Sequence, residues 1–262
     1  MTGTHRPRKR FGQHFLHDRN IVRKLLAAIR PEPGQSLLEI GPGQGALTLP
    51  LLEQCGELTA IELDRDLIDE LQRRAESIGR LHLIQADILK VDLSELPLSP
   101  PLRVVGNLPY NISTPLMFHL LQWRDRIADM HFMLQKEVAE RIIARPGGKH
   151  YGRLSVTMQY HCETEYLFDV PPGCFSPPPK VDSAIIRLRP WDRLPHPVAN
   201  TERLGQLVQA AFGQRRKTVS NSLKAFVDAN ALRRLGIDPK ARAENLSLED
   251  YCRIANAMET RS

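Results

Sequence analysis

The sequence predicts an α/β fold: a mostly parallel sheet with helices on both faces and an antiparallel edge, followed by a small all-helical domain. Strand-like runs alternate with helical patterns over residues 36–134, which is typical of a parallel sheet. Two later strand-like runs have no predicted helix between them, which favours an antiparallel edge. Beyond residue 200 only helical periodicity remains, which indicates the second domain.

The first elements follow a basic N-terminal arm. Residues 18–29 place apolar side chains at helical spacing behind Asp18, so we expect a helix capped by this aspartate. Residues 36–40 predict a strand, residues 41–45 a glycine turn, and residues 46–54 a helix. The sheet therefore begins with a strand, a turn and a helix.

The same alternation continues through the rest of the chain. Strands are expected at residues 58–61, 81–84, 103–105 and 130–134, and helices at 66–77 and 114–121. The late strands are expected at 154–161 and 181–190, on either side of the proline-rich segment 170–180. Helical patterns follow at residues 202–212, 217–226 and 248–258.

The composition is that of an ordinary globular protein, with 42% apolar and 25% charged residues in a chain of 262. No apolar stretch approaches the roughly 20 residues of a membrane helix, and no apolar segment follows the N-terminal charges. We therefore expect a cytoplasmic protein with no membrane association. Its cysteines, Cys55, Cys162, Cys174 and Cys252, form no C-x-x-C pair, which predicts buried thiols and neither a metal site nor a disulfide.

Charge is distributed unevenly along the chain. Residues 1–30 hold eight Lys or Arg against one acidic residue, residues 31–189 hold 16 against 21, and residues 190–262 hold 12 against eight. Basic ends around an acidic middle favour a polyanionic partner, although a solvated arm and a solvated helical face would give the same pattern.

We expect three parts from these features. They are a basic arm (1–17), an α/β domain (18–193) and a helical domain (194–262).

Glycines and acids occupy three successive strand ends. Gly41, Gly43 and Gly45 follow the strand 36–40, where missing Cβ atoms let the main chain approach a ligand and a helix start offers free N–H groups. Glu62 ends the next strand, where a carboxylate can accept hydrogen bonds from a ribose diol. Asp87 ends the third strand and could accept from an adenine amino group. This pattern resembles that of S-adenosylmethionine-dependent methyltransferases.

Other interpretations of the glycine turn remain open. Its third glycine comes one residue earlier than in the G-x-G-x-x-G pattern of dinucleotide enzymes, and no lysine closes it as in phosphoryl transfer. No histidine stands out for hydride transfer. A turn that merely packs a strand on a helix, or a nicotinamide-dependent enzyme, is the alternative.

The segment GNLPYNISTP, residues 106–115, follows the fourth strand at the same edge of the sheet. In the methyltransferase interpretation, the Asn107 side-chain oxygen and a main-chain carbonyl near Pro109 bind the two N–H groups of an adenine amine. They thereby turn its lone pair out of the ring. Tyr110 would stack on the base, which is worth about 1–3 kcal/mol. A strand-ending turn without function is the alternative.

A more specific resemblance comes from segments that occur in order over most of the chain. They are RKRFGQHFL (8–16), EIGPGQGALT (39–48), IELD (61–64), GNLPYNISTPLMFHLL (106–121), MLQKEVAERI (133–142), YGRLSV (151–156) and FSPPPKVDSAIIRL (175–188). Together they resemble the ribosomal RNA small-subunit adenine dimethyltransferase family. The resemblance implies N6,N6-dimethylation of two adjacent adenosines in the 3′-terminal hairpin loop of 16S rRNA, in small-subunit biogenesis, with S-adenosylmethionine as cofactor.

The resemblance also implies site residues. With Gly43 of the glycine turn, the cofactor contacts are His14, Leu16, Gly41, Glu62, Asp87 and Asn107. His14 stands where the family often has Asn, and the contact could come from its ring or its main chain. Phe175 aligns with an aromatic residue that the family places against the target base, opposite Tyr110. A core phenylalanine is the alternative.

The expected partner is small-subunit ribosomal RNA in an immature particle, bound by a monomer without a metal ion. The candidate RNA-backbone contacts are Arg6, Arg8, Lys9, Arg10, Arg215, Arg216 and Lys217. Two other functions remain: a large-subunit rRNA adenine methyltransferase of the macrolide-resistance type, and a ribosome-assembly or nucleic-acid-binding factor on the same scaffold.

Overall fold

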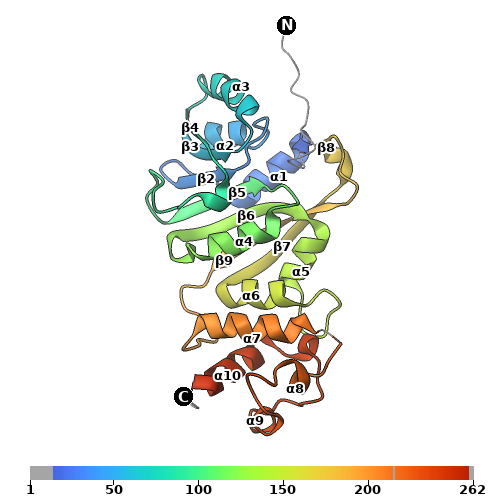
Figure 1. The fold of residues 1–262 in the computed structure, drawn as a ribbon. Helices are drawn as coiled ribbons and strands as arrows, with labels where there is room; N and C mark the ends of the chain where they lie inside the picture. The colour runs from blue at the N-terminus through green and yellow to red at the C-terminus, as the bar shows by residue number, and fades with distance from the viewer. Residues whose placement is uncertain (1–13, 215, 260–262) are drawn as a thin grey trace. The chain divides into compact units, whose positions relative to one another are not determined.

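The computed structural model describes residues 14–214 and 216–259. The chain divides into two compact units, shown in Figure 1. The sheet unit comprises the described residues up to Ala139 together with Glu165–Pro190, and the helical unit comprises Glu140–Thr164 with the described residues from Trp191 on. Residues 140–164 thus join the helical tail. Arg6, Arg8, Lys9, Arg10 and Arg215 lie outside the described residues.

A seven-stranded sheet in the order β4-β3-β2-β5-β6-β9-β7 forms the centre of the sheet unit. Its strands are β2 (Ser36–Ile40), β3 (Glu57–Glu62), β4 (Arg80–Gln85), β5 (Leu102–Asn107), β6 (Ile127–Gln135), β7 (Cys162–Val170) and β9 (Ser183–Pro190). Pairing is parallel from β4 through β6, and β9 runs antiparallel to β6. The predicted parallel sheet with an antiparallel edge is therefore confirmed.

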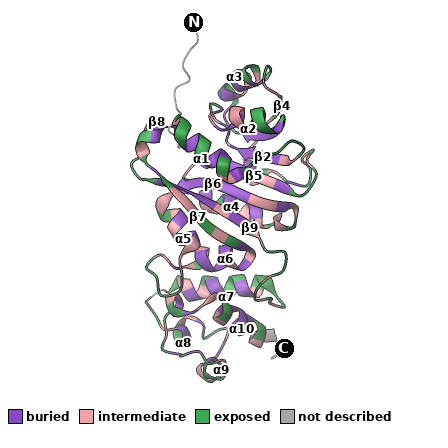
Figure 2. Ribbon diagram, turned by 180° about the vertical axis from the view of Figure 1, so that it is seen from behind, coloured by how far each residue is buried: buried purple, intermediate pink, exposed green. Residues whose placement is uncertain are grey.

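Helices accompany the sheet as the alternating pattern predicts. The predicted helices are α1 (Arg19–Ile29), α2 (Thr48–Cys55), α3 (Arg65–Ala75) and α4 (Ser113–Leu121). A further helix, α5 (Lys136–Ile143), follows β6 and was not among the predicted elements. Asp18 caps α1 as expected, since its Oδ1 accepts from the main-chain N of Asn20 at 2.7 Å and of Ile21 at 3.0 Å. Figure 2 shows the central strands largely buried and the helices exposed along one side. No helix in the described ranges is long and apolar enough to cross a membrane.

The predicted strand at residues 154–161 is wrong, because this segment forms α6 (Arg153–His161) and β7 begins at Cys162. Its β-branched residues favour a strand, but packing overrides propensity. Val156 and Tyr160, four residues apart, both reach the core of the helical unit. The Ser155 hydroxyl also accepts from the Gly152 main-chain N at 3.0 Å and so fixes the helix start.

The helical unit is built from α6 and the C-terminal helices. These are α7 (Thr201–Gly213), α8 (Val219–Ser222), α9 (Ala229–Arg234) and α10 (Leu248–Glu259). The helix predicted at residues 217–226 is shorter than expected, since only α8 forms there. Leu207, Val219 and Tyr251 are among the fully buried residues of this unit's own apolar core.

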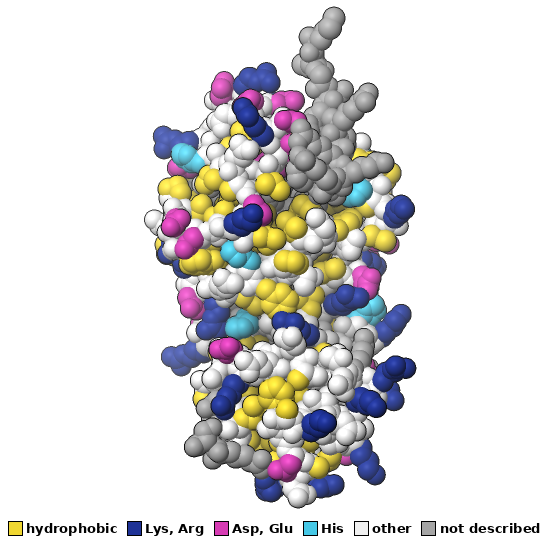
Figure 3. Space-filling view, in the orientation of Figure 1, with side chains coloured by type: hydrophobic (Ala, Val, Ile, Leu, Met, Phe, Trp, Pro, Cys, Tyr) yellow, Lys and Arg dark blue, Asp and Glu magenta, His cyan; other side chains and the backbone are white. Residues whose placement is uncertain are grey.

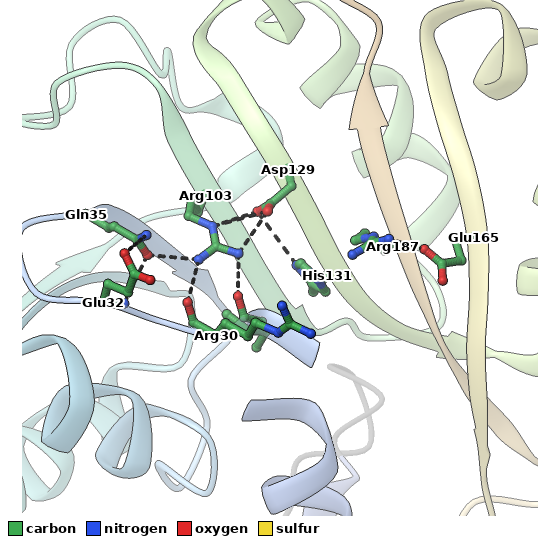
Figure 4. Close-up of polar contacts among 9 residues, drawn as sticks. Arg30, Glu32, Gln35, Arg103, Asp129, His131, Glu165 and Arg187 are labelled. Atoms are coloured by element: carbon green, nitrogen blue, oxygen red, sulfur yellow. Dashed lines mark hydrogen bonds and ion pairs between the residues drawn. The ribbon is translucent and has the colours of Figure 1, made fainter. Parts of the chain in front are cut away.

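A half-buried ionic cluster fastens the end of α1 to the sheet (Figure 4). The Arg103 guanidinium on β5 contacts Asp129 Oδ2 on β6 at 2.8 Å and donates to the Arg30 carbonyl at 3.1 Å and Gln35 Oε1 at 2.8 Å. His131 lies next to this pair, and burial lowers its pKa to about 4, so the ring is neutral at pH 7. The charges of Arg103 and Asp129 are therefore paired, and the hydrogen bond to the Arg30 carbonyl fixes the end of α1 on the sheet.

A two-stranded antiparallel sheet joins the end of the basic arm to the proline-rich loop. Residues Phe15–Leu16 form β1 and Phe175–Ser176 form β8, with Leu16 opposite Phe175. The His17 main-chain N donates to the Cys174 carbonyl at 3.0 Å and extends the pairing. Segments about 160 positions apart therefore act as one element.

Gly106 at the end of β5 is required by close approach of β2. A Cβ on this residue would lie 2.6 Å from the Ile40 carbonyl oxygen. We expect Gly106→Ala to lower the free energy of unfolding by about 1–3 kcal/mol, the usual cost of overpacking. Denaturant unfolding measures this change. Gly205→Ala on α7, where nothing lies within 4 Å, is the control and should not destabilise the protein; equal effects would contradict the steric explanation.

Candidate active site

One cavity of about 220 Å³ lies at the carboxyl ends of β2, β3, β4 and β5. Every predicted cofactor residue lines it: His14, Leu16, Gly41, Gly43, Glu62, Asp87 and Asn107, and so do Pro109 and Tyr110. The structure therefore brings together residues that the sequence places on separate strand ends. In the described part of the chain, no group of His, Cys, Asp and Glu residues is arranged to hold a metal ion.

The glycine turn gives the cavity an open wall. Gly43 has φ +55°, in the left-handed region, and a Cβ there would lie 3.2 Å from the Phe15 ring of β1. The main chain thus passes close beneath β1 and keeps its N–H groups near the cavity. This cradle fits a cofactor that must approach the main chain closely.

The Glu62 carboxylate is fixed by two main-chain hydrogen bonds. Its Oε2 accepts from the Gly43 N at 3.1 Å, and its Oε1 accepts from the Asp64 N at 2.8 Å. Burial raises the pKa of Glu62, and these two hydrogen bonds to the ionised form oppose that rise. Each oxygen keeps a further lone pair, which suits the two hydroxyls of a ribose.

Asp87 ends the cavity on the β4 side. Its Oδ1 accepts from the Leu89 N at 3.1 Å, and its Oδ2 lies 3.9 Å from the Lys90 Nζ in a side chain that is 34% exposed. A long surface ion pair of this kind leaves Oδ2 able to accept a hydrogen bond from a ligand. Leu63 and Ile88 also line this end. Leu63 is 49% exposed, which is unusual for a leucine and suits the face of an adenine ring. The sequence analysis missed Leu63, although an apolar residue between Glu62 and Asp64 at a strand end was a usable signal.

The orientation of the Asn107 amide follows from a single contact. Its Nδ2 donates to the His14 carbonyl oxygen at 3.1 Å. Because a carbonyl oxygen only accepts, this contact assigns the nitrogen to the His14 side and leaves Oδ1 as an acceptor. The family resemblance left open how His14 acts, and here its main chain orients Asn107.

The carbonyl groups after Asn107 differ in their availability. The Pro109 carbonyl accepts from the Ile112 N at 3.1 Å and lies 3.4 Å from the Ser113 hydroxyl. The Leu108 N donates to the Met133 carbonyl at 3.1 Å, whereas its own carbonyl accepts no loop or turn hydrogen bond among the described residues. The second acceptor near Pro109 is therefore best supplied by Leu108, a residue that the sequence analysis did not name.

Tyr110 lies between His14 and β9. Its hydroxyl is 2.7 Å from the Ser183 Oγ, and its ring stacks on the His14 ring with centroids 5.6 Å apart and planes at 29°. His14 Nδ1 is 2.8 Å from the Pro177 carbonyl, so it carries the proton that makes this hydrogen bond. Burial raises the pKa of Tyr110, which keeps the phenol neutral.

Phe175 does not line the cavity. Only 3% of it is exposed, and it packs in the apolar core of the sheet unit with Leu16 and Met133. Its burial supports the alternative of a core phenylalanine that anchors β8 under β1. Arg216 and Lys217 are exposed on the helical unit.

A second acid, Glu39, lies beneath the glycine turn. It lines the cavity, is 2% exposed, and its Oε2 has no hydrogen-bond partner in the described ranges. Burial raises the pKa of Glu39 to about 8, and the nearby Glu62 charge adds to this rise. The side chain is thus mostly protonated at pH 7. Sequence reasoning gave it no role, because its position inside a strand predicts an apolar residue.

A glycine turn without a lysine, the fixed Glu62 carboxylate and free acceptors at the strand ends of a Rossmann-like sheet fit an S-adenosylmethionine-dependent methyltransferase. The model of the ribosomal RNA adenine dimethylase family matches residues 4–260. The chain therefore belongs to this family, and it is an RNA adenine methyltransferase with S-adenosylmethionine as methyl donor.

Relatives and solved structures agree with this family. A Legionella pneumophila (strain Corby) protein named ribosomal RNA small subunit methyltransferase A is 56% identical over 251 residues, covering 96% of this chain and 97% of that protein. One of the same name from Idiomarina loihiensis is 52% identical over 252 residues, covering 96% and 88%.

Two crystal structures show the same fold. A dimethyladenosine transferase from Plasmodium falciparum is similar with a TM-score of 0.81 and 26% identity, over 95% of this chain and 98% of that chain. The 23S rRNA methyltransferase ErmE is similar with a TM-score of 0.74 and 26% identity, over 94% and 99%.

The protonated Glu39 makes stability depend on pH. Between its usual pKa of 4.5 and its folded pKa of about 8, the unfolded chain carries the charge and the folded chain carries the proton, so stability falls as pH rises. Glu39→Gln mimics the protonated acid. The free energy of unfolding of the wild type should therefore fall relative to that of Glu39→Gln as the pH rises, by up to about 1.4 kcal/mol per pH unit in this window.

Denaturant unfolding at several pH values between about 5 and 8 measures the difference between Glu39→Gln and the wild type. Glu53→Gln, on the exposed side of α2, is the control and should track the wild type at every pH. A Glu39→Gln curve parallel to that of the wild type would show that Glu39 is already ionised in the folded protein.

Proposed function

We propose that this enzyme dimethylates N6 of two adjacent adenosines in the 3′-terminal hairpin loop of small-subunit ribosomal RNA, as a monomer acting on an immature particle in the cytoplasm. The observation that carries the proposal is the orientation of Asn107, whose Nδ2 is taken by the His14 carbonyl and whose Oδ1 remains an acceptor. The names of the relatives favour the small subunit as the target.

Different residues of the cavity would bind different parts of the cofactor. Glu62 would hold the ribose hydroxyls, Asp87 the adenine amino group and Leu63 the adenine face of S-adenosylmethionine. The cofactor supplies an electrophilic methyl group on a sulfonium centre. The Gly43 main chain leaves room for it beside β1.

The groups around the target amine would act mainly by positioning it. An adenine amine is a poor nucleophile because its lone pair is delocalised into the ring. The Asn107 Oδ1 and the Leu108 carbonyl would accept its two hydrogens and turn the lone pair out of the ring plane, while Tyr110 stacks on the base. No strong general base is required, because the methylated ammonium is acidic. Holding the reactants in line supplies most of the rate.

The likeness to the 23S rRNA methyltransferase ErmE keeps a large-subunit target as the second candidate. Its fold is similar at 26% identity, whereas the small-subunit relatives are 52–56% identical. Transfer to purified immature small subunits and to large-subunit RNA, tested side by side, separates the two.

We expect Asn107→Ala and Glu62→Ala to reduce methyl transfer to immature small subunits by about 100-fold or more, comparable with the loss of one transition-state hydrogen bond. Only Glu62→Ala should also weaken S-adenosylmethionine binding strongly, because Glu62 meets the ribose. Incorporation of labelled methyl groups and calorimetry measure the two effects. Asn111→Ala is the control, because Asn111 lines the same cavity, whereas the hydrogen bonds to the Gly43 N and the His14 carbonyl come from Glu62 and Asn107. Full activity of both variants would refute the site assignment.

We propose that the helical unit binds RNA phosphates through exposed cations that include Arg216 and Lys217. Lys and Arg side chains outnumber acids over the lower part of the face in Figure 3. Arg216→Glu with Lys217→Glu should weaken particle binding and make the log–log salt slope shallower by about 1 to 2. Binding at several salt concentrations measures this slope. The control is Arg233→Glu with Arg234→Glu, which makes the same change in charge on α9. An equal effect of the control would show that net charge alone, and not a contact at Arg216 and Lys217, sets the salt slope.

A further inference from the structure

The side-chain hydroxyl of Ser183, at the start of β9, is hydrogen-bonded to the Tyr110 hydroxyl. The two oxygens are 2.7 Å apart, and Ser183 is 0% exposed, so water does not compete for its hydroxyl. Ser183 is itself fixed, because it pairs with Gln135 in the ladder between β6 and β9. A rigid strand therefore holds the phenol end of Tyr110.

The ring of Tyr110 is held at a second point by His14. The two rings stack at 5.6 Å, and the His14 ring is in turn fixed by the Pro177 carbonyl at 2.8 Å from Nδ1. Phe15 and Ser176 pair next to these two residues, so β1 and β8 fix the backbone of both. One face of Tyr110 is therefore occupied by the protein itself.

We propose that Ser183 is a positioning residue that, together with the His14 ring, clamps Tyr110 so that a target base stacks on one face only. Ser183 touches neither the base nor the cofactor. Its hydrogen bond fixes the far end of the Tyr110 side chain and so the direction of the ring axis, while the stacked His14 ring fixes the plane of the Tyr110 ring. The two contacts together set the plane of the base and thereby the direction in which its amine points toward Asn107 Oδ1. This role rests on the proposed function for its catalytic consequence, but the clamp itself is a property of the free protein.

The clamp explains why a tyrosine stands at position 110 although stacking needs only a ring. A phenylalanine would stack equally well, but its ring could swing about the Cα–Cβ bond, since nothing would hold its far end. Rigidity matters here because loss of orientation costs rate even when binding is retained. The Tyr110 hydroxyl is thus assigned to holding the ring through its hydrogen bond with Ser183.

A double-mutant cycle tests the clamp. Ser183→Ala and Tyr110→Phe each remove one half of the hydrogen bond, so each should lower kcat about five- to tenfold, the equivalent of one lost hydrogen bond. The double variant should fall no further than either single variant, because both remove the same interaction. S-adenosylmethionine affinity should stay within about twofold of the wild type, since Glu62 and Asp87 are untouched.

Ser222→Ala is the matched control, because the Ser222 Oγ is buried without a hydrogen-bond partner in the described ranges. It should leave kcat unchanged. Multiplicative losses in the double variant, or a kcat for Ser183→Ala equal to that of the wild type, would overturn the proposal.

A second measurement works without RNA. In the free protein, the stacked Tyr110 ring shifts the proton resonances of the His14 ring, and this shift should shrink in Ser183→Ala and stay in Ser222→Ala. An unchanged shift in Ser183→Ala would overturn the clamp even if activity fell. If the wild type methylated neither RNA, the proposed function would fail, and the resonance shift alone would decide whether the clamp exists.

Discussion

The hydrogen bond from the Asn107 amide to the His14 carbonyl is the contact on which the active site depends. It assigns the two ends of a side chain that could otherwise face either way, and only one assignment presents an acceptor to an amine. The His14 carbonyl is placed in turn by β1, which pairs with β8. A two-residue strand at the end of a basic arm thus determines the chemistry at the end of β5. Loss of that pairing would disable Asn107 without touching it.

Electrostatics inside the cavity suit a cation. Glu62 is held in place by main-chain N–H groups, and Asp87 keeps one oxygen accessible, so two carboxylates face a ligand that carries a sulfonium charge. A third carboxylate in the same cavity would repel the other two. Burial solves this problem at Glu39 by keeping the proton on it near neutral pH. The acidic middle of the chain thus suits a cationic cofactor, whereas the proposed RNA contacts lie in its basic ends.

Sequence patterns anticipated the fold well wherever local signals and packing agreed. The alternation of strands and helices, the Asp18 cap and the strand-end acids are all local features, and the structure has them. The strand prediction at residues 154–161 was wrong because β-branched side chains favour a strand, whereas here they belong to a helix that Val156 and Tyr160 pack against the core of the helical unit. The availability of the Leu108 carbonyl and the burial of Phe175 were also out of reach, since both depend on main-chain hydrogen bonds and strand pairing between distant segments.

The two methyl transfers depend on these contacts to different extents. An unmodified adenine amine offers two hydrogens, so Asn107 Oδ1 and the Leu108 carbonyl can both orient it. After one transfer a single N–H remains, and one acceptor is left without a partner. Orientation of the monomethylated base must then come more from stacking, which depends on how firmly the Tyr110 ring is held. If the proposed clamp acts on the base, the bond from Tyr110 to Ser183 and the stack on His14 weigh more in the second transfer than in the first. A site that relied on its acceptors alone would orient the monomethylated base less firmly than the unmodified one, whereas a clamped ring would orient both alike.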